Sequence, residues 1–402
     1  MTYSSIEEVL ESVTNGEIVI VTDDQERENE GDLICAAEKI TDEKVNFMLK
    51  HGRGQVCMPI LPELCHKLDL PPMVAENTAP LQTAFTVPID LVSVRTGITA
   101  QEKAATILAA ISPNAKPSDF VRPGHLFPLA AKEGGVLRRA GHTEAAIDLV
   151  RLAGLQPAGV LCEILNETGN RAATNELFEL AENYHLRITT IEELIRYRRR
   201  HEKMVECVVE SKLPTKYGIG VIRIYRVKYE PEEPIAIVLG DITKTDAPLV
   251  RLHSSCFTGD LIGSLRCDCG DQLHLAMKKM QEENAGVLVY LPQEGRGIGL
   301  AEKIKAYKLQ DQGLDTVDAN IALGYKADLR DYGVGIQILK DLGIAKVRLL
   351  TNNPKKTDAF IYGGFDLEVV DQIPIMGQVN LYNEHYIATK RDRMGHNIPD
   401  KF

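Results

Sequence analysis

Short apolar runs alternate with longer amphipathic segments along the chain. Residues 18–21 and 286–291 are apolar runs that are short enough to be buried strands. Residues 208–213 and 220–225 alternate apolar and polar side chains, as half-buried strands do, whereas residues 300–310 follow a glycine-rich turn and are expected to form a helix. We therefore predict the α/β class, of the α+β kind, with two three-layer-like domains built on mixed sheets.

The length of the chain predicts two domains. A chain of 402 residues exceeds what one hydrophobic core supports, so two domains of about 200 residues each are the natural division. Thr190 and Glu193 have the spacing of a capping box, and the helix that they start runs into the basic residues 197–203. We expect these basic residues to be a helix end or linker with solvated charges, and we place the domains at residues 1–202 and 203–402.

The composition and charge of the chain argue against nucleic-acid and membrane partners. The formal net charge of −11 argues against binding to nucleic acid, which needs a basic surface. No apolar run approaches the ~20 residues of a membrane span, and the amino terminus has no charged-then-apolar signal segment. The eight cysteines then predict a reducing, cytoplasmic environment. We expect small-molecule substrates, no nucleic acid or membrane partner, and a homodimer.

Three closely spaced cysteines are the most informative feature of the sequence. Cys256, Cys267 and Cys269 offer three soft thiolates to one metal ion, with no obvious fourth ligand. Three protein ligands and one open position are typical of catalytic zinc, which activates water. Gly263 and Gly270 supply the permissive backbone that such a tight turn uses.

Other interpretations of the cysteines remain open. The three thiols could form a disulfide or belong to the core, or His253 or His274 could complete a closed structural zinc site. A four-coordinate site of that kind would indicate a zinc-stabilised nucleotide-binding module without enzymatic activity.

A glycine-rich turn follows the apolar run at 286–291. Residues 293–299 (Gln-Glu-Gly-Arg-Gly-Ile-Gly) lead into the helix expected at 300–310, so backbone N–H groups at the start of that helix could face an anion. The spacing matches neither the P-loop nor the Rossmann fingerprint.

Several motifs of the second half occur in a characteristic order. They are residues 251–255 (Arg-Leu-His-Ser-Ser) before the cysteines, residues 294–300 (Glu-Gly-Arg-Gly-Ile-Gly-Leu), residues 315–320 (Asp-Thr-Val-Asp-Ala-Asn) and residues 328–333 (Asp-Leu-Arg-Asp-Tyr-Gly). Over roughly residues 207–402 the chain closely resembles GTP cyclohydrolase II of riboflavin biosynthesis.

This resemblance implies a reaction and a set of residues. Zinc-bound hydroxide would attack C8 of the guanine of GTP, that carbon would leave as formate, and pyrophosphate would be removed. One zinc ion would be held by Cys256, Cys267 and Cys269. The residues surrounding GTP would be Arg251, Leu252, His253, Ser254, Ser255, Gln272, Glu294, Gly295, Arg296, Thr316, Thr351 and Lys356.

The resemblance also implies two catalytic residues, Asp328 as a proton acceptor and Arg330 as a nucleophile toward the α-phosphorus. A guanidinium is protonated at ordinary pH and is a poor nucleophile. Electrostatic stabilisation of the phosphate is the physically easier role for Arg330. Taken without the resemblance, the two residues are typical of a surface ion pair.

The first half carries two polar clusters. Six acids lie within residues 23–32, directly after the apolar run at 18–21, and carboxylates of this kind suit magnesium unless they form a solvated loop. Residues 138–146 (Arg-Arg-Ala-Gly-His-Thr-Glu-Ala-Ala) place arginines, a glycine and a threonine ahead of a helix, as a phosphate site does. His142 could complete a metal site with an acid of the first cluster, although a histidine beside a glycine is equally typical of a cap or surface.

Together these clusters resemble 3,4-dihydroxy-2-butanone 4-phosphate synthase. The matching segments span about residues 1–200 and are residues 24–32, 52–57, 83–87, 95–100, 123–129, 141–145 and 162–164. The resemblance implies conversion of D-ribulose 5-phosphate to L-3,4-dihydroxy-2-butanone 4-phosphate and formate. It implies that Glu28 and His142 bind Mg²⁺ or Mn²⁺, as one ion or two. The acid/base candidates are His125 and Glu163, and the residues holding the sugar phosphate are Arg27, Glu28, Asp32, Arg139, Ala140, Gly141, His142, Thr143 and Glu163.

We therefore predict a bifunctional enzyme of riboflavin biosynthesis, a lyase fused to a hydrolase. Three alternatives are kept beside it. The first half could be a silent scaffold attached to a working cyclohydrolase, the second half could perform only nucleotide hydrolysis at its zinc, or the chain could be the non-enzymatic zinc module described above.

Overall fold

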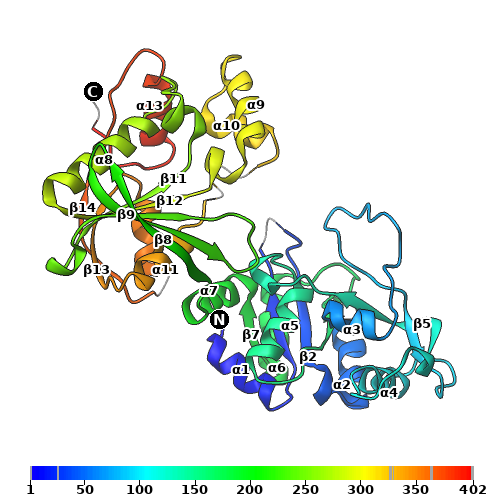
Figure 1. Ribbon diagram of the computed structural model, residues 1–402. Coiled ribbons are helices and arrows are strands. Elements are labelled where there is room, and N and C mark those ends of the chain that lie inside the picture. The colour runs from blue at the N-terminus through cyan, green and yellow to red at the C-terminus, as the bar shows by residue number, and fades with distance from the viewer. Residues whose placement is uncertain (1, 25–26, 326–327, 329, 363–364, 400–402) are drawn as a thin grey trace. The chain divides into compact units, whose positions relative to one another are not determined.

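The computed structural model describes residues 2–24, 27–325, 328, 330–362 and 365–399. These residues form two compact units, the first ending at Arg198 and the second beginning at Arg199, and each is built on a seven-stranded sheet (Figure 1). The mixed sheets and their covering helices confirm the predicted fold class. Within the described ranges, no helix combines the length and apolar character needed to cross a membrane.

The sheet of the first unit has the strand order β4-β5-β3-β6-β2-β1-β7. Strand β1 pairs antiparallel with β2 and parallel with β7, and β3 pairs parallel with β5. The apolar run predicted as a strand at 18–21 is confirmed as β1, which lies between β2 and the edge strand β7. The strand bounds are β1 (Val19–Thr22), β2 (Gly31–Ala36), β3 (Cys57–Ile60), β4 (Ile89–Leu91), β5 (Phe120–Ala130), β6 (Gly159–Glu163) and β7 (Arg187–Thr190).

Helices cover both faces of this sheet because its strands send apolar side chains to both sides. In β1, Ile20 packs into one core cluster, while Val19 and Val21 pack into another. The Ile20 cluster contains residues from α2 (Asp42–Phe47), α3 (Pro62–Lys67), α4 (Ala100–Ala110) and α6 (Thr174–Tyr184). The other cluster contains residues from α1 (Ile6–Thr14), α5 (His142–Leu152) and α7 (Ile191–His201). The first unit is thus a three-layer structure.

The sheet of the second unit has the strand order β14-β13-β11-β12-β10-β9-β8. Strand β11 lies parallel to β12 and β13, whereas β8, β9 and β10 form an antiparallel part of the sheet. The strand bounds are β8 (Val205–Thr215), β9 (Gly218–Val227), β10 (Ile235–Gly240), β11 (Leu249–Ser254), β12 (Ala285–Leu291), β13 (Lys346–Leu350) and β14 (Glu368–Ile373). The strands predicted at 208–213, 220–225 and 286–291 are confirmed.

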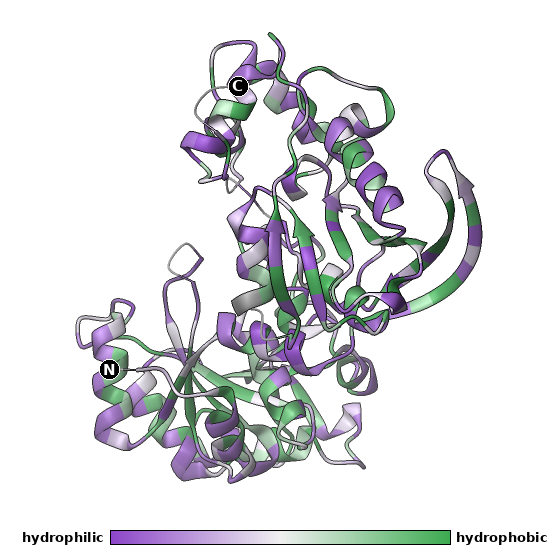
Figure 2. Ribbon diagram, turned by 90° about the vertical axis from the view of Figure 1, so that its left-hand side faces the viewer, coloured by the Kyte–Doolittle hydropathy of each residue, from purple (hydrophilic) through white to green (hydrophobic). Residues whose placement is uncertain are grey.

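Helices also pack on both faces of the second sheet. Val287 and Val289 of β12 belong to one core with α11 (Gly333–Asp341) and α12 (Pro354–Tyr362), while Leu288 belongs to another with α8 (Cys269–Glu283). Figure 2 shows the hydrophobic residues concentrated on the strands of each unit and the hydrophilic residues on the outer sides of the helices. The remaining helices are α9 (Leu300–Gln310), which confirms the predicted helix, α10 (Thr316–Ala322) and α13 (Glu384–Asp392).

A buried ion pair near the end of α7 corrects the expectation that the basic run is solvated. Arg198 is only 1% exposed, and its guanidinium donates to Asp148 Oδ2 at 2.8 Å and to the Gly134 carbonyl at 2.6 Å. Asp148 lies on α5 and also accepts the Val136 N–H at 2.8 Å. Arg198 therefore ties the last helix of the first unit to α5, while Arg200 is exposed as predicted.

Replacement of Arg198 by Met should destabilise the first unit by about 3–5 kcal/mol, because it leaves the Asp148 carboxylate buried without its cation. Amide hydrogen exchange read by mass spectrometry would report the opening free energy of β1 and β2 separately from the second unit. The matched control is Arg200→Met on the same helix, which should change little because Arg200 is exposed. If the amide hydrogens of β1 and β2 were equally protected in the two variants, the Arg198–Asp148 pair would not stabilise the first unit.

Candidate active sites

The acidic loop between β1 and β2 is folded around Asp23. The Asp23 carboxylate accepts the backbone N–H groups of Glu28 at 3.1 Å and Glu30 at 3.0 Å, and the Arg27 guanidinium donates to it at 2.9 Å. These bonds fix Arg27, Glu28 and Glu30 around the Asp23 carboxylate. The solvated-loop alternative for these described acids therefore does not fit the structure.

His142 faces this loop from the first residue of α5. Its Nε2 donates to the Val21 carbonyl at 3.1 Å, so Nδ1 is the ring nitrogen that faces the acids. Nδ1 lies 3.7 Å from Glu28 Oε2 and 4.0 Å from Asp32 Oδ1. Asp32 is 2% exposed, and its Oδ1 has no hydrogen-bond partner among the described residues. Two carboxylates thus lie close to the same ring nitrogen of His142.

The acids of this cluster repel one another in the absence of a cation. Burial, followed by the charge of Asp32, raises the pKa of Glu30 to about 8, and burial raises the pKa of Asp32 to about 7. Burial opposes ionisation of Glu28 too, but a hydrogen bond with His142 and the charge of Arg27 lower its pKa to about 2. A divalent ion would relieve this excess of negative charge.

The distances fit such an ion. Two ligands ~2.1 Å from one Mg²⁺ lie at most about 4.2 Å apart, and both separations around His142 are within this limit. Two groups of possible ligands share His142, one with Asp23 and Glu28 and the other with Glu30 and Asp32. The arrangement is compatible with one or two ions.

The two predicted acid/base residues of the first unit each have a defined partner. His125 is exposed, and its Nδ1 lies 2.7 Å from Asp90 Oδ2, while its backbone N–H donates to Asp90 Oδ1 at 3.0 Å. Glu163 is the register partner of Asp32 across β2 and β6, and its Oε2 accepts the Gln55 N–H at 2.7 Å. Glu163 therefore lies beside Asp32, a possible metal ligand, and His125 is oriented by a buried carboxylate.

Asp90 is a residue that the sequence does not reveal. It stands in the short strand β4 without a motif of its own, and only the pairing of β4 with β5 brings it to His125. Gly97 has a positive φ of 74°, and a Cβ there would lie 2.1 Å from Asp90 Oδ2. The loop at residue 97 can pack over this carboxylate only because it carries a glycine.

The residues expected to hold the sugar phosphate lie near this cluster but are already engaged with acids. Arg27 donates to Asp23 and to Glu28 at 2.7 Å, and Arg139 donates to Glu144 at 2.7 Å. Gly141 is the N-cap residue of α5, Thr143 is buried and Ala140 is exposed. Because the arginines share their charge with carboxylates, the backbone N–H groups at the start of α5 are a second set of possible donors for an anion.

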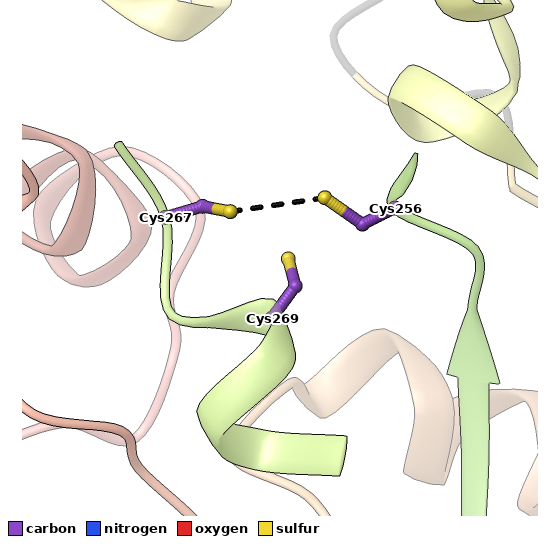
Figure 3. Close-up of side chains that lie close together, drawn as sticks. All are labelled: Cys256, Cys267 and Cys269. Atoms are coloured by element: carbon purple, nitrogen blue, oxygen red, sulfur yellow. Dashed lines mark hydrogen bonds between the residues drawn. The ribbon is translucent and has the colours of Figure 1, made fainter. Parts of the chain in front are cut away.

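In the second unit, the three predicted cysteines converge (Figure 3). Cys256 follows β11, and Cys269 begins α8. The Sγ atoms of Cys256 and Cys267 are 3.7 Å apart, close to the ~3.8 Å expected for two sulfurs bound at 2.3 Å to one tetrahedral zinc ion. The cluster is therefore compatible with zinc, and Figure 3 shows the three sulfurs directed toward a common point.

Gly259, which the sequence analysis did not single out, packs directly against the thiols. A Cβ at this position would lie 2.8 Å from Cys267 Sγ and 3.1 Å from Cys256 Sγ. The two glycines that were singled out have different functions: Gly263 has a positive φ of 67°, and a Cβ at Gly270 would lie 2.3 Å from the Gly259 carbonyl oxygen. Small residues on both sides thus let the turn close around the sulfurs.

The histidines considered as a fourth ligand have other partners. His253 is 2% exposed, and its Nε2 lies 3.0 Å from Asp260 Oδ1; its ring stacks on Tyr290. His274 Nδ1 lies 2.8 Å from the Tyr217 hydroxyl. Among the described residues, the possible metal ligands grouped at this place are the three cysteines. The geometry is that of an open site and does not support the closed structural one.

Lys303 is a further residue of the cysteine site that was missed. It is 9% exposed, and its ammonium donates to Cys256 Sγ at 3.1 Å, Thr258 Oγ1 at 2.9 Å and Glu294 Oε1 at 2.8 Å. Hydrogen bonds from the neighbouring thiols, and then the charge of Lys303, hold the pKa of Cys256 well below its ordinary value. The only sequence signal was its place in the first turn of the predicted helix.

Two adjoining cavities open beside the cysteines. They lie where the parallel strands β11, β12 and β13 end, the usual ligand position in such sheets. The first cavity contains Arg251, His253, Gln272, Thr351 and Lys356, and the second contains Ser255, Cys256, Cys267, Glu294, Gly295, Lys303, Tyr307 and Thr316. Both are lined by Ser254, Cys269, Arg296, Arg330 and Tyr386.

Every predicted GTP contact except one lines these cavities. Leu252 is fully buried, with its side chain in the core of the unit. Its backbone carbonyl accepts the Lys356 ammonium at 2.7 Å, so it contributes through the main chain only. Any contact of Leu252 with a ligand in these cavities would therefore use its main chain.

The first cavity has an excess of positive charge. Burial, and then the neighbouring Arg251 and Arg330, lower the pKa of Lys356 well below its ordinary value. Both guanidinium Nη atoms of Arg296 are buried without a hydrogen-bond partner among the described residues. An anionic ligand would supply both the missing charge and the missing acceptors.

Asp328 and Arg330 form a partly buried bidentate pair and not an exposed surface ion pair. Arg330 donates to Asp328 Oδ1 at 2.8 Å and to Oδ2 at 2.6 Å. Although burial opposes it, Tyr332 and Asp328 raise the pKa of Arg330 above its ordinary value. The same pairing holds the pKa of Asp328 below its ordinary value, against the effect of burial. Arg330 is thus a fixed cation at the junction of the two cavities.

Comparison with known proteins covers both units. The family model for 3,4-dihydroxy-2-butanone 4-phosphate synthase matches residues 7–197, and that for GTP cyclohydrolase II matches residues 206–374. The riboflavin biosynthesis protein RibBA of Bacillus mycoides (strain KBAB4) is 54% identical over 394 residues, 98% of this chain and 99% of the relative. RibBA of Aquifex aeolicus (strain VF5) is 53% identical over 398 residues, 98% of each chain.

A solved structure is also similar over most of the chain. RibBX, a two-domain 3,4-dihydroxy-2-butanone 4-phosphate synthase from A. baumannii, is 38% identical with a TM-score of 0.72. The match covers 92% of this chain and 99% of the other. The two-unit architecture is therefore shared with an experimentally determined protein.

Fold and sites define a two-domain enzyme with one carboxylate–histidine site and one three-cysteine site. The chain belongs to the RibBA family of bifunctional riboflavin biosynthesis proteins, which join a 3,4-dihydroxy-2-butanone 4-phosphate synthase to a GTP cyclohydrolase II. The predicted family, enzyme class and pathway are confirmed, and they are favoured over a silent scaffold or a non-enzymatic module.

Replacement of Asp90 by Asn should lower kcat of the synthase reaction by about 10²-fold or more with little change in KM, because His125 would lose the carboxylate that orients its ring. The matched control is Asp69→Asn, at an exposed position of the same unit. Formate release from ribulose 5-phosphate gives kcat and KM for both variants. An Asp90→Asn chain with wild-type kcat would show that His125 needs no orientation or plays no part in the reaction.

Proposed function

We propose that the first site converts D-ribulose 5-phosphate to L-3,4-dihydroxy-2-butanone 4-phosphate and formate. The observation that carries this proposal is the convergence of His142 Nδ1, Glu28 Oε2 and the unpartnered Asp32 Oδ1 in a buried acidic cluster. Glu28 and His142 would hold Mg²⁺ or Mn²⁺, as one ion or two. The metal, when bound, would stabilise the negative charge that develops on the sugar oxygens when a proton next to the ketone is removed.

The neighbouring residues would then move protons and hold the phosphate. Glu163, beside Asp32 across the sheet, and His125, oriented by Asp90, would act as acid and base from separate places. Arg27 and residues 139–143 would receive the phosphate, with the amino terminus of α5 as the main anion site.

We propose that the second site hydrolyses GTP to 2,5-diamino-6-(5-phosphoribosylamino)pyrimidin-4(3H)-one, formate and pyrophosphate. The observation that carries this proposal is an open three-thiol cluster whose sulfurs line a cavity that continues into a cationic one. Cys256, Cys267 and Cys269 would hold one zinc ion. That ion, when bound, would supply an activated water for attack at guanine C8.

The two cavities suit the two ends of the nucleotide. The triphosphate would occupy the first, where Arg251 and Lys356 are buried with an excess of positive charge, and the base would occupy the second, beside the thiols. Arg330 would stabilise phosphate charge as a cation, because its pairing with Asp328 favours the protonated form. Asp328 would accept a proton only once a substrate phosphate competes for Arg330.

We further propose that each reaction belongs to its own half, residues 1–202 and 203–402, and that the chain works as a cytoplasmic homodimer on small-molecule substrates. All eight cysteines, each within the described part of the chain, are free thiols, which supports a reducing compartment. Sedimentation equilibrium of the purified chain would test the dimer.

The two sites should be separable by single substitutions. Cys267→Ser should lose stoichiometric zinc and formate release from GTP while keeping turnover of ribulose 5-phosphate, because it removes a ligand from the second site only. Glu28→Ala should do the reverse, with only partial rescue by excess magnesium. Metal analysis gives the zinc content of both variants, and separate assays give formate release from each substrate. The reaction that each variant keeps shows that its chain is folded. Retention of both zinc and GTP turnover by Cys267→Ser would remove the catalytic-zinc proposal.

The halves should also work when separated. Fragments 1–202 and 199–402 overlap so that the second keeps the Arg199 and Glu202 carbonyls, which accept the Gln337 side chain at 2.7 and 3.0 Å. Each fragment contains a complete sheet and should keep its own reaction within a few-fold of the full chain. If fragment 199–402 binds zinc but releases formate from GTP only after fragment 1–202 is added, the halves do not act independently.

A further inference from the structure

The segment that follows β14 contributes to the nucleotide cavity although it lies outside the GTP cyclohydrolase II match, which ends at residue 374. This segment, residues 375–399, contains α13 and supplies one wall of the first cavity. The residues concerned are Tyr386, Lys390, Met394 and His396. The cavity is therefore completed by residues to which the family match assigns nothing.

Lys390 reaches from α13 to the cysteine turn. It is 9% exposed, and its ammonium donates to Asp268 Oδ1 at 2.6 Å while it lies 4.3 Å from the centre of the Tyr386 ring. Asp268 is 2% exposed and is the single residue between Cys267 and Cys269. Its other oxygen accepts the Gln272 amide at 2.6 Å. Both oxygens of this carboxylate are thus fixed, one of them by the C-terminal segment.

Other contacts hold the segment in the same place. The Gln378 N–H donates to Asp271 Oδ2 at 3.0 Å in the first turn of α8, and a Cβ at Gly377 would lie 2.6 Å from the Asp271 Cβ. At the cavity, Asn352 exchanges two hydrogen bonds with the backbone of Ile375, at 3.0 and 2.9 Å. The segment is therefore anchored on the cysteine turn and on the strand end that forms the cavity floor.

We propose that Lys390 is a positioning residue of the second site, which holds the turn from Cys267 to Cys269 so that both sulfurs face the cavity. The inference rests on the proposed GTP reaction for its kinetic consequence, but not for its effect on metal binding. Without the ammonium, the buried Asp268 carboxylate would lack its counter-ion and would turn toward water, and the two flanking cysteines would move with it. Partners of this kind, one step removed from a metal ligand, contribute about 10–100-fold to metal affinity or activity.

The test compares three full-length variants with the wild-type chain. Lys390→Met removes the charge, Lys390→Arg keeps a donor for Asp268, and Lys340→Met is the matched control, because Lys340 is exposed at the end of α11. Zinc retention is measured against a graded series of chelator, and kcat and KM are measured for formate release from GTP. Turnover of ribulose 5-phosphate by the same chain reports that the variants are folded.

For Lys390→Met we expect zinc to be lost at about tenfold lower chelator concentration and kcat to fall about 10–100-fold, with KM for GTP within a few-fold of wild type. Lys390→Arg should recover most of both losses, and Lys340→Met should match wild type. As a second measurement, Asp268→Asn should reproduce the Lys390→Met defect, and the double variant should be no worse than either single one.

Several results would overturn the proposal. Unchanged zinc retention and kcat in Lys390→Met would do so, as would a rise in KM alone, which would make Lys390 a direct phosphate contact. An equal fall in ribulose 5-phosphate turnover would also do so, because the change would then act on the whole chain. A wild-type chain that binds zinc but releases no formate from GTP would instead refute the proposed reaction, while the chelator series would still decide the role of Lys390.

Discussion

Burial of charges of one sign is the constraint on which both sites depend. Around His142 the fold brings together Asp23, Glu28, Glu30 and Asp32, of which Asp32 is almost fully buried with an unpartnered oxygen. In the second unit it buries cations around a cavity and places three thiols beside it. Such groups are costly to remove from water unless something of opposite charge joins them. The first site therefore suits a cation, and the second suits a cation at the sulfurs and a polyanion next to them.

The backbone makes these clusters possible by placing them at strand ends. In the first unit, the loop from β1 to β2 supplies the acids, and α5 begins with His142, so that one short loop and one helix start face each other. In the second unit, β11, β12 and β13 run parallel, so the segments that follow them lie at the same end of the sheet. These segments contain Cys256, Glu294 and Thr351, respectively. Side chains at such an edge are not fully covered by the helices that bury the faces of the sheet. The core can then be mostly apolar while the edge remains charged.

The sequence predicted what depends on local patterns. The strands at residues 18–21 and 286–291 follow from short apolar runs, the helix at 300–310 from the glycine-rich turn before it, and the cysteine cluster from its spacing. What it missed depends on contacts between distant segments. Asp90 is 35 positions from His125, Lys303 is 47 from Cys256, and Lys390 is 122 from Asp268. None of these carries a motif, so only the topology of the sheets can pair them. Arg198 shows the same limit, because a run of arginines gives no sign that one of them meets a buried Asp148.

The shared two-unit fold does not by itself establish the second activity. RibBX of A. baumannii covers 92% of this chain with a TM-score of 0.72, yet it is described as a synthase only. A fold can host more than one function or none, so the evidence for a cyclohydrolase here has to come from side chains. That evidence is the set of three sulfurs open toward a cavity, the Lys303 ammonium bonded to one of them, and a cationic neighbour cavity. A relative that keeps the sheet but lacks the cysteines or their cationic partners would retain the fold and lose the chemistry, because the sheet is stabilised by apolar packing that does not involve these residues.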